Sequence, residues 1–187
     1  MEKLKEKINN IFRKNSKFSL IEMNDIDITE DPVRPELSLT FRTIYGRKIY
    51  GLKNKNGDIM AIICIAFTNE IPTTVEELDM LSRDAAGPSV LRAGIVGKIA
   101  VAYTVWAKMK GGGKHILNEI FKKFKREQHI ERLVTLSPLT EMAERFHIKN
   151  GAKLLQRNDT TQNFEYDITL EQWNKYLERA KGFFKLK

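Results

Sequence analysis

Three consecutive glycines, Gly111 to Gly113, stand between an apolar run at 98–106 and a long amphipathic helical pattern. Glycine lets the backbone approach a ligand closely and adopt angles closed to other residues. The first turn of the helix then presents free N–H groups and the positive end of its dipole. This strand–glycine–helix order favours a mixed α/β fold and predicts an anion site suited to a pyrophosphate.

Lysines flank the glycine turn, with Lys110 before it and Lys114 after it. The spacing satisfies neither the P-loop pattern nor the GxGxxG pattern of dinucleotide-binding proteins. A flexible connection with solvated lysines is the alternative to an anion site. The turn taken alone leaves both interpretations open.

The rest of the chain follows the same alternation of elements. Apolar patterning predicts strands at 59–67, 98–106, 132–136, 153–156 and 163–168, and a hairpin within 36–54 that turns near Gly46. Periodicity and capping patterns predict helices at 2–13, from Thr74 through Leu81, after the glycine turn, at 140–149 and from Thr169 to about Arg179, with a loop at 84–89. We therefore expect one mixed α/β domain over 1–187, with a lead-in at 1–36, a core at 37–168 and a C-terminal helix at 169–187.

The net charge and the cysteine count restrict the partners and sites that we expect for this protein. The net charge of +8 suits a partner that is nucleic acid or a polyanionic small molecule such as coenzyme A. The single cysteine, Cys64, excludes an intrachain disulfide and a cysteine-based zinc site, and its apolar surroundings predict burial. We expect no metal site.

No apolar run approaches the ~20 residues that span a bilayer, and the N-terminus lacks a secretory pattern, so we expect a cytoplasmic protein without a membrane partner.

Two polar residues lie close together in the sequence near the end of the core. Ser137 closes a strand just before Pro138, and His147 lies about two turns along the next predicted helix. They could flank a reaction. They could also be ordinary residues, with Ser137 capping the helix and His147 hydrogen-bonded to backbone.

A family resemblance rests on two of these segments. The pattern K-x-x-G-x-G at 108–113 resembles the turn that binds the pyrophosphate of acyl-coenzyme A in the GNAT acetyltransferase fold, and AERFHIKNGA at 143–152 resembles the next helix of that fold. The resemblance implies an acyl-CoA phosphate site formed by Lys108, Lys110, Gly111, Gly112, Gly113, Lys114 and His115.

A narrower resemblance comes from the histidine, because ordinary members of that fold often have a tyrosine at the position of His147. TLSP at 135–138 and FHIKNGA at 146–152 resemble two signatures of malonyl-CoA decarboxylase, and IAFTNEIP, VAYTV and NFEYD are similar as well. The resemblance covers roughly 59–168. It implies that Ser137 and His147 are a catalytic pair, that a CoA thioester is the substrate, and that no other cofactor is required.

Three functions remain open from the sequence. The first is a decarboxylase-like acyl-CoA enzyme that uses Ser137 and His147 on a malonyl-type thioester. The second is an N- or O-acyltransferase with an unknown acceptor, in which His147 takes the place of the tyrosine. The third is a non-catalytic module that binds CoA or nucleic acid through the basic face of 108–126. Single-strand binders stack bases on exposed aromatics, whereas Phe121 and Phe124 fall on the apolar helix face, so we expect malonyl- or acetyl-CoA as the partner and no specific nucleic acid.

Overall fold

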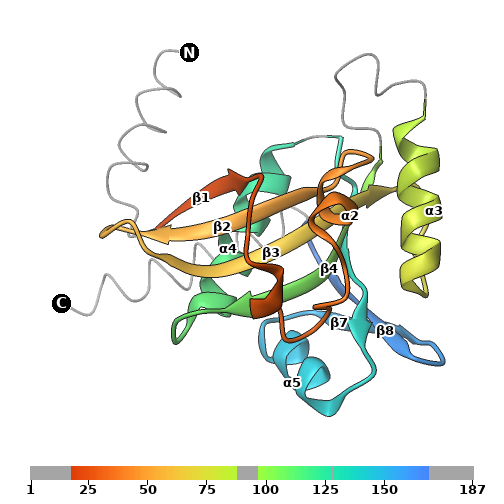
Figure 1. The fold of residues 1–187 in the computed structure, drawn as a ribbon. Coiled ribbons are helices and arrows are strands. Elements are labelled where there is room, and N and C mark those ends of the chain that lie inside the picture. The colour runs from red at the N-terminus through yellow and green to blue at the C-terminus, as the bar shows by residue number, and fades with distance from the viewer. Residues whose placement is uncertain (1–17, 88–96, 128, 169–187) are drawn as a thin grey trace, which may run out of the picture.

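The computed structural model describes residues 18–87, 97–127 and 129–168. They form one mixed eight-stranded sheet with helices on both faces (Figure 1). The strands are β1 (Phe18–Met23), β2 (Lys48–Asn54), β3 (Ile59–Thr68), β4 (Ile99–Ala107), β5 (Arg132–Thr135), β6 (Ser137–Pro138), β7 (Lys153–Arg157) and β8 (Thr161–Tyr166). The helices are the 3-10 turn η1 (Ile28–Glu30), α2 (Leu39–Thr43), α3 (Val75–Ala86), α4 (Gly112–Arg126) and α5 (Glu141–Lys149). The predicted mixed α/β class is confirmed.

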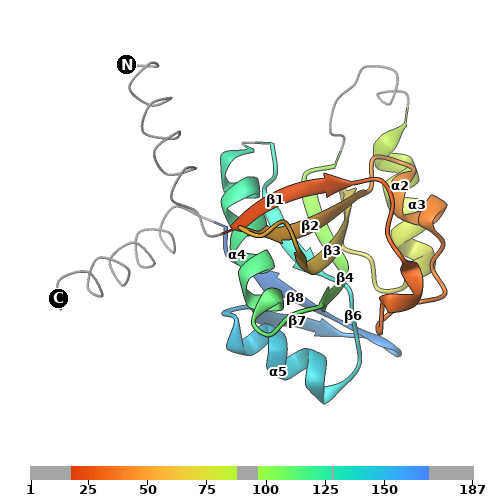
Figure 2. The same cartoon turned by 60° about the vertical axis from the view of Figure 1, so that its left-hand side comes forward.

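The sheet changes character between β4 and β5. Strands β1 to β4 form an antiparallel meander, whereas β4 and β5 are parallel. A parallel pair needs a crossover connection, and α4 supplies it on one face of the sheet (Figure 2). Strand β8 then pairs with β5 and β6 along one edge and with β7 along the other. The glycine turn and the Ser137 segment therefore follow two adjacent parallel strands.

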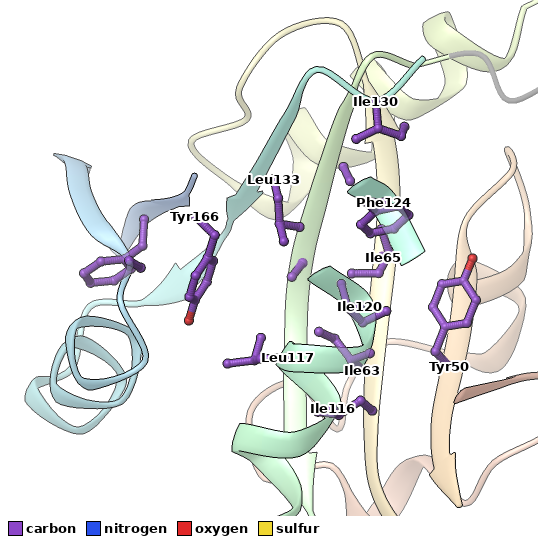
Figure 3. Packing of buried hydrophobic residues seen from close by; sticks show 14 of the residues in the cluster. Tyr50, Ile63, Ile65, Ile116, Leu117, Ile120, Phe124, Ile130, Leu133 and Tyr166 are labelled. Carbon is purple, nitrogen blue, oxygen red and sulfur yellow. The ribbon is translucent and has the colours of Figure 1, made fainter. Parts of the chain in front are cut away.

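Strand β3 lies at the centre of the core. Ile63 and Ile65 face α4, where Ile116, Ile120 and Phe124 cover them (Figure 3). The alternate residues of β3, including Cys64, face the other layer with α2 and α3. Both faces of the strand are thus buried, which explains its continuous apolar run. The predicted burial of Cys64 is confirmed, since its side chain is 0% exposed.

The predicted capping box at the start of α3 is confirmed in part. The Thr74 hydroxyl accepts from the Glu77 N–H at 3.1 Å, whereas the Glu77 carboxylate accepts mainly from the N–H and hydroxyl of Thr73, both at 2.7 Å, and more weakly from the backbone of Thr74. The loop predicted at 84–89 begins too early, because α3 continues to Ala86. Burial of the last two alanines of the helix explains the extension.

The first half of the hairpin predicted within 36–54 is wrong. Apolar alternation there suggested a strand, but the chain forms α2, which Ser38 caps by accepting from the Phe41 N–H at 3.1 Å. The helix directs Arg42 inward to a buried ion pair with Asp31 at 2.9 Å, so tertiary contacts override the local pattern. Strand β2 begins after Gly46 as predicted, whereas β1 was not predicted. The helices predicted at 2–13 and 169–179 lie outside the described residues.

Candidate functional site

The two parallel strands part next to the candidate serine. Strands β4 and β5 pair only as far as Ala102 and Thr135, after which the Leu136 N–H donates to the Ala102 carbonyl at 2.9 Å. Ser137 pairs with β8 instead. On its other edge β4 carries an extra residue, Tyr103, at a bulge against β3. The backbone therefore opens between β4 and β6.

Arg34 lies across the start of this opening. Its Nε donates to the carbonyl of Tyr103 at 2.9 Å, and its Nη2 donates to the carbonyl of Leu136 at 3.1 Å. The Asp31 carboxylate fixes the turn before it by accepting from the N–H groups of Val33 and Arg34 at 2.8 and 3.2 Å. One buried guanidinium thus satisfies a carbonyl on each of the two diverging strands, which would otherwise be costly to bury.

A cavity of about 260 Å³ lies along β4 at this opening. It is lined by Val33, residues 102–107 of β4, Gly113 and Leu117 of α4, Ser137 and Pro138 of β6, and Met142, Ala143, Phe146 and His147 of α5. The glycine turn, the serine and the histidine thus contribute to one cavity, whose walls are mostly apolar.

Ser137 and His147 are in direct contact in this cavity. Ser137 Oγ lies 2.8 Å from His147 Nε2, and His147 Nδ1 lies 2.8 Å from the hydroxyl of Tyr166. Ser137 Oγ also lies 3.0 Å from Thr135 Oγ1, which in turn accepts from the N–H of Phe164 at 3.1 Å. The four side chains form a continuous hydrogen-bonded chain from Tyr166 to Thr135.

The imidazole of His147 lies in an apolar site. Its ring stacks on Phe164 with centroids 4.9 Å apart and meets Phe146 edge-on at 5.1 Å, and the residue is 4% exposed. Burial disfavours the charged form and lowers the pKa of His147 to about 4. The histidine is therefore neutral at pH 7, with one ring nitrogen donating and the other accepting.

The hydrogen-bond partners of His147 favour one tautomer of its imidazole. Burial raises the pKa of the Tyr166 phenol, so it keeps its proton and needs an acceptor. Among the described residues that acceptor is His147 Nδ1, which leaves the ring proton on Nε2. Nε2–H then donates to Ser137 Oγ, and Ser137 donates to Thr135. The alternative tautomer would leave the buried Tyr166 proton without a partner in this part of the chain.

Each of the three glycines in the turn is required for a different structural reason. Gly111 is the N-cap of α4 with φ of 82°, in the left-handed region. A Cβ on Gly112 would lie 2.4 Å from the carbonyl oxygen of Met60, so this glycine lets α4 approach β3. A Cβ on Gly113 would lie 3.1 Å from the ring of Phe146, so this glycine admits α5.

The remaining residues of the predicted phosphate site lie around the start of α4. Lys110 and Lys114 are exposed. Lys108 pairs with Glu30 at 2.5 Å, and the ring of His115 packs on Phe18 with centroids 4.5 Å apart. The N–H groups of Gly112 and His115 donate to the carbonyls of Met109 and Gly111, whereas those of Gly113 and Lys114 come too early in the helix to have an intrahelical acceptor. The local geometry can accept an anion.

Sequence reasoning missed three members of the site. Arg34 carried no recognised signal, and Thr135 begins the segment TLSP, in which only Ser137 was given a role. Tyr166 lies within the segment NFEYD, but only its similarity to a family was noted. Its period-2 spacing from Phe164 could have placed both rings on one face of β8, against α5. Among the described residues no group of acidic, histidine or cysteine side chains could hold a metal ion, and none of the helices there is long and apolar enough to cross a membrane.

Comparisons with known proteins find similarity in fold rather than in sequence. No protein-family model matches the chain, and no curated protein matches it significantly. Malonyl-CoA decarboxylase from Agrobacterium vitis superposes with a TM-score of 0.54 at 18% identity, over 68% of this chain and 35% of that one. The chain thus spans about a third of the decarboxylase.

Two smaller proteins match over nearly their whole length. The loading GNATL domain of CurA from Lyngbya majuscula gives a TM-score of 0.54 at 15% identity, over 82% of this chain and 98% of that one. An acetyltransferase from Bacillus subtilis, solved in complex with CoA, gives 0.53 at 8% identity, over 81% and 97%. The chain therefore has the fold shared by GNAT acetyltransferases and by the matching part of malonyl-CoA decarboxylase.

Proposed function

We propose that the chain is an acyl-CoA enzyme that removes CO2 from a malonyl-type thioester, with Ser137 and His147 acting at the acyl end. The observation that carries this proposal is the hydrogen-bonded chain Tyr166–His147–Ser137 in a mostly apolar cavity. A buried histidine that a tyrosine holds in one tautomer, with its N–H directed at a cavity hydroxyl, is suited to delivering a proton.

The glycine turn is the proposed site for the phosphates of coenzyme A. Gly113 and His147 line the same cavity, so a thioester arm running along β4 would connect the start of α4 with the acyl end. Exposed Lys110 and Lys114 and the helix dipole favour the pyrophosphate there. Lys108 already has a carboxylate partner, so we assign it a smaller part. The Bacillus subtilis acetyltransferase with this fold was solved with CoA.

Decarboxylation breaks one carbon–carbon bond of the malonyl group. The electron pair of that bond moves toward the thioester carbonyl and gives an enolate, while CO2 leaves. Transfer of the carboxylate from water to an apolar cavity removes hydration that the charge loses anyway on departure. The hydroxyl of Ser137, 5% exposed at the cavity wall, orients the carboxylate by turning its proton from Thr135 to that group.

The enolate carbon then takes a proton, which gives the acetyl thioester. The carbanion is a much stronger base than imidazole or phenolate, so the transfer is downhill. His147 donates from Nε2, directly or through Ser137 Oγ, and regains a proton at Nδ1 from Tyr166. After turnover water supplies a proton to Nε2, and Nδ1 returns its proton to Tyr166, which restores the starting tautomer. Atoms balance, because one malonyl thioester and one proton give one acetyl thioester and CO2.

Acyl transfer is the second candidate, favoured by the match to acetyltransferases over nearly their full length. An acceptor would have to reach the thioester carbonyl. Arg34 bridges the two strands at the start of the opening, which leaves an acceptor to share the cavity with the thioester. This arrangement supports decarboxylation, which needs no second organic substrate.

Mass spectrometry after incubation with malonyl-CoA tests the proposal. We expect acetyl-CoA and CO2 to form without an added acceptor, and acetyl-CoA incubated with pools of amines to remain unchanged. Acylated amines in the second incubation, with malonyl-CoA left intact in the first, would replace the decarboxylase by an acyltransferase. Inertness toward both thioesters, with CoA still bound, would leave a CoA-binding module.

A further inference from the structure

The contact between Ser137 and His147 depends on a short connection. Ser137 belongs to β6 and His147 to α5, and only Leu139 and Thr140 lie between these two elements. Leu139 is 44% exposed, so its side chain does little to anchor the connection. Unless the backbone here is held, α5 can shift relative to β6 and carry the imidazole away from the serine.

Gln162 of β8 holds this connection at three points. Its backbone pairs with Ser137 in the sheet. Its side-chain Nε2 donates to the carbonyls of Pro138 and Thr140, both at 3.0 Å. Pro138 ends β6 and Thr140 is the N-cap of α5, so one amide joins the end of the strand to the start of the helix. Because both acceptors are carbonyls, only the NH2 end of the amide can occupy this position.

The side chain of Gln162 is buried, and its two donated hydrogen bonds explain why this position holds a glutamine. Gln162 is 1% exposed, and its Oε1 is buried without a partner among the described residues. A buried acceptor without a donor is destabilising, and an apolar side chain of equal length would avoid that cost. What such a side chain cannot supply is the pair of N–H donors to the connection.

We infer that Gln162 is a positioning residue that fixes α5 on β6 and so keeps Nε2 of His147 on Oγ of Ser137. Its effect on turnover rests on the proposed function, whereas its effect on the geometry of His147 does not. Phe164 and Tyr166 follow it at every second residue of β8 and contact the same imidazole. Strand β8 thus supplies Gln162, which holds the connection, Phe164, which stacks on the imidazole, and Tyr166, which donates a hydrogen bond to it.

The variant Gln162→Met keeps the length of the side chain and removes both donors. Nitrogen-15 and proton NMR of the wild type should show the His147 Nε2–H in slow exchange with solvent, and Gln162→Met should broaden or lose that signal. Turnover of malonyl-CoA should fall about 10²-fold, the effect of a misplacement of roughly 1 Å, with KM within about twofold. The control is Gln156→Met, whose amide donates to Asn163 Oδ1 in the same hairpin and should leave both readouts unchanged.

A wild-type measurement covers the case in which Gln162→Met does not fold. The side-chain amide protons of Gln162 should exchange with solvent far more slowly than those of an exposed glutamine. Fast exchange, or a wild-type His147 signal in folded Gln162→Met, would overturn the inference. If the wild type does not turn over malonyl-CoA, the proposed function fails, while the NMR measurements still decide the role of Gln162.

Discussion

The hydroxyl oxygen of Ser137 lies 2.8 Å from Nε2 of His147, which brings the end of a strand and the second turn of the next helix into one hydrogen bond. Both residues are at least 95% buried and both line the cavity beside β4. A serine that merely capped α5 would face the helix start, but Thr140 does that by accepting from the Ala143 N–H. Neither polar group is explained by local structure alone.

Removing the imidazole should impair chemistry and spare binding. We expect His147→Ala to lower kcat on malonyl-CoA by about 10²- to 10⁴-fold, the range for a positioned proton donor. Ser137→Ala should lower it as well. Calorimetry should give CoA affinities close to wild type for both variants, because the proposed phosphate site lies at the start of α4. Full turnover by folded His147→Ala would sink the assignment.

His147→Tyr separates the two candidate reactions. In a decarboxylase the longer phenol misplaces the proton and lacks a second nitrogen to receive one from Tyr166, so activity should be lost. In an acyltransferase the change restores the residue common in that fold, and much of the transfer activity should remain. Steady-state assays of both reactions on the same preparation give the comparison.

Folding stability should depend on pH through His147. Its pKa is about 4 in the folded chain and ~6.5 when unfolded. Between these values the unfolded chain holds a proton that the folded chain does not, so the free energy of unfolding falls as pH drops from 6.5 to 4. The shift corresponds to about 3 kcal/mol in full.

Urea denaturation at several pH values measures this loss, with His147→Gln as the control for the carboxylates that titrate in the same window. The wild type should lose more stability than His147→Gln between pH 6.5 and 4. Parallel curves for the two proteins would mean that the imidazole is accessible to water.

Sequence patterns identified the elements whose signals are local. The glycine turn, the buried run of β3 and the turn near Gly46 all follow from short-range rules, and Gly46 and Gly111 indeed have φ values of 75° and 82°. The segment 37–41 shows where such rules fail. Its alternation resembles a strand, yet a buried ion pair from Arg42 to Asp31 decides for a helix.

In the candidate site as well, sequence patterns identified some residues and missed those whose role depends on the fold. The serine and histidine could be named from motifs, because both lie in segments with a family resemblance. Arg34 could not, since its role depends on where the chain parts after β4 and β5, and its two acceptors lie 69 and 102 residues further along the chain. The tautomer of His147 depends on Tyr166, which only the fold of β8 against α5 brings within 2.8 Å.

Two substitutions in the glycine turn should have different effects, one on folding stability and the other on CoA binding. Gly112→Ala places a methyl group against the Met60 carbonyl and should lower the free energy of unfolding by about 1–3 kcal/mol, as overpacking does. Lys114→Ala, at an exposed position of the first turn, should leave stability unchanged and weaken CoA binding. Thermal unfolding and calorimetry on both variants give the test. CoA affinity that is indifferent to Lys114 would point to another phosphate site.

Arg34 should stabilise the opening between the strands. Arg34→Met leaves the carbonyls of Tyr103 and Leu136 without their donor, and we expect a loss of about 2–6 kcal/mol, since each buried unsatisfied group costs ~1–3 kcal/mol. Arg145→Met is the matched control, because that side chain is 74% exposed in a surface ion pair with Glu141 and should cost less than ~1 kcal/mol. Chemical denaturation of the two variants measures the difference. Equal stability of Arg34→Met and wild type would show that water replaces the guanidinium, and the opening would then be accessible from the α3 side of the sheet.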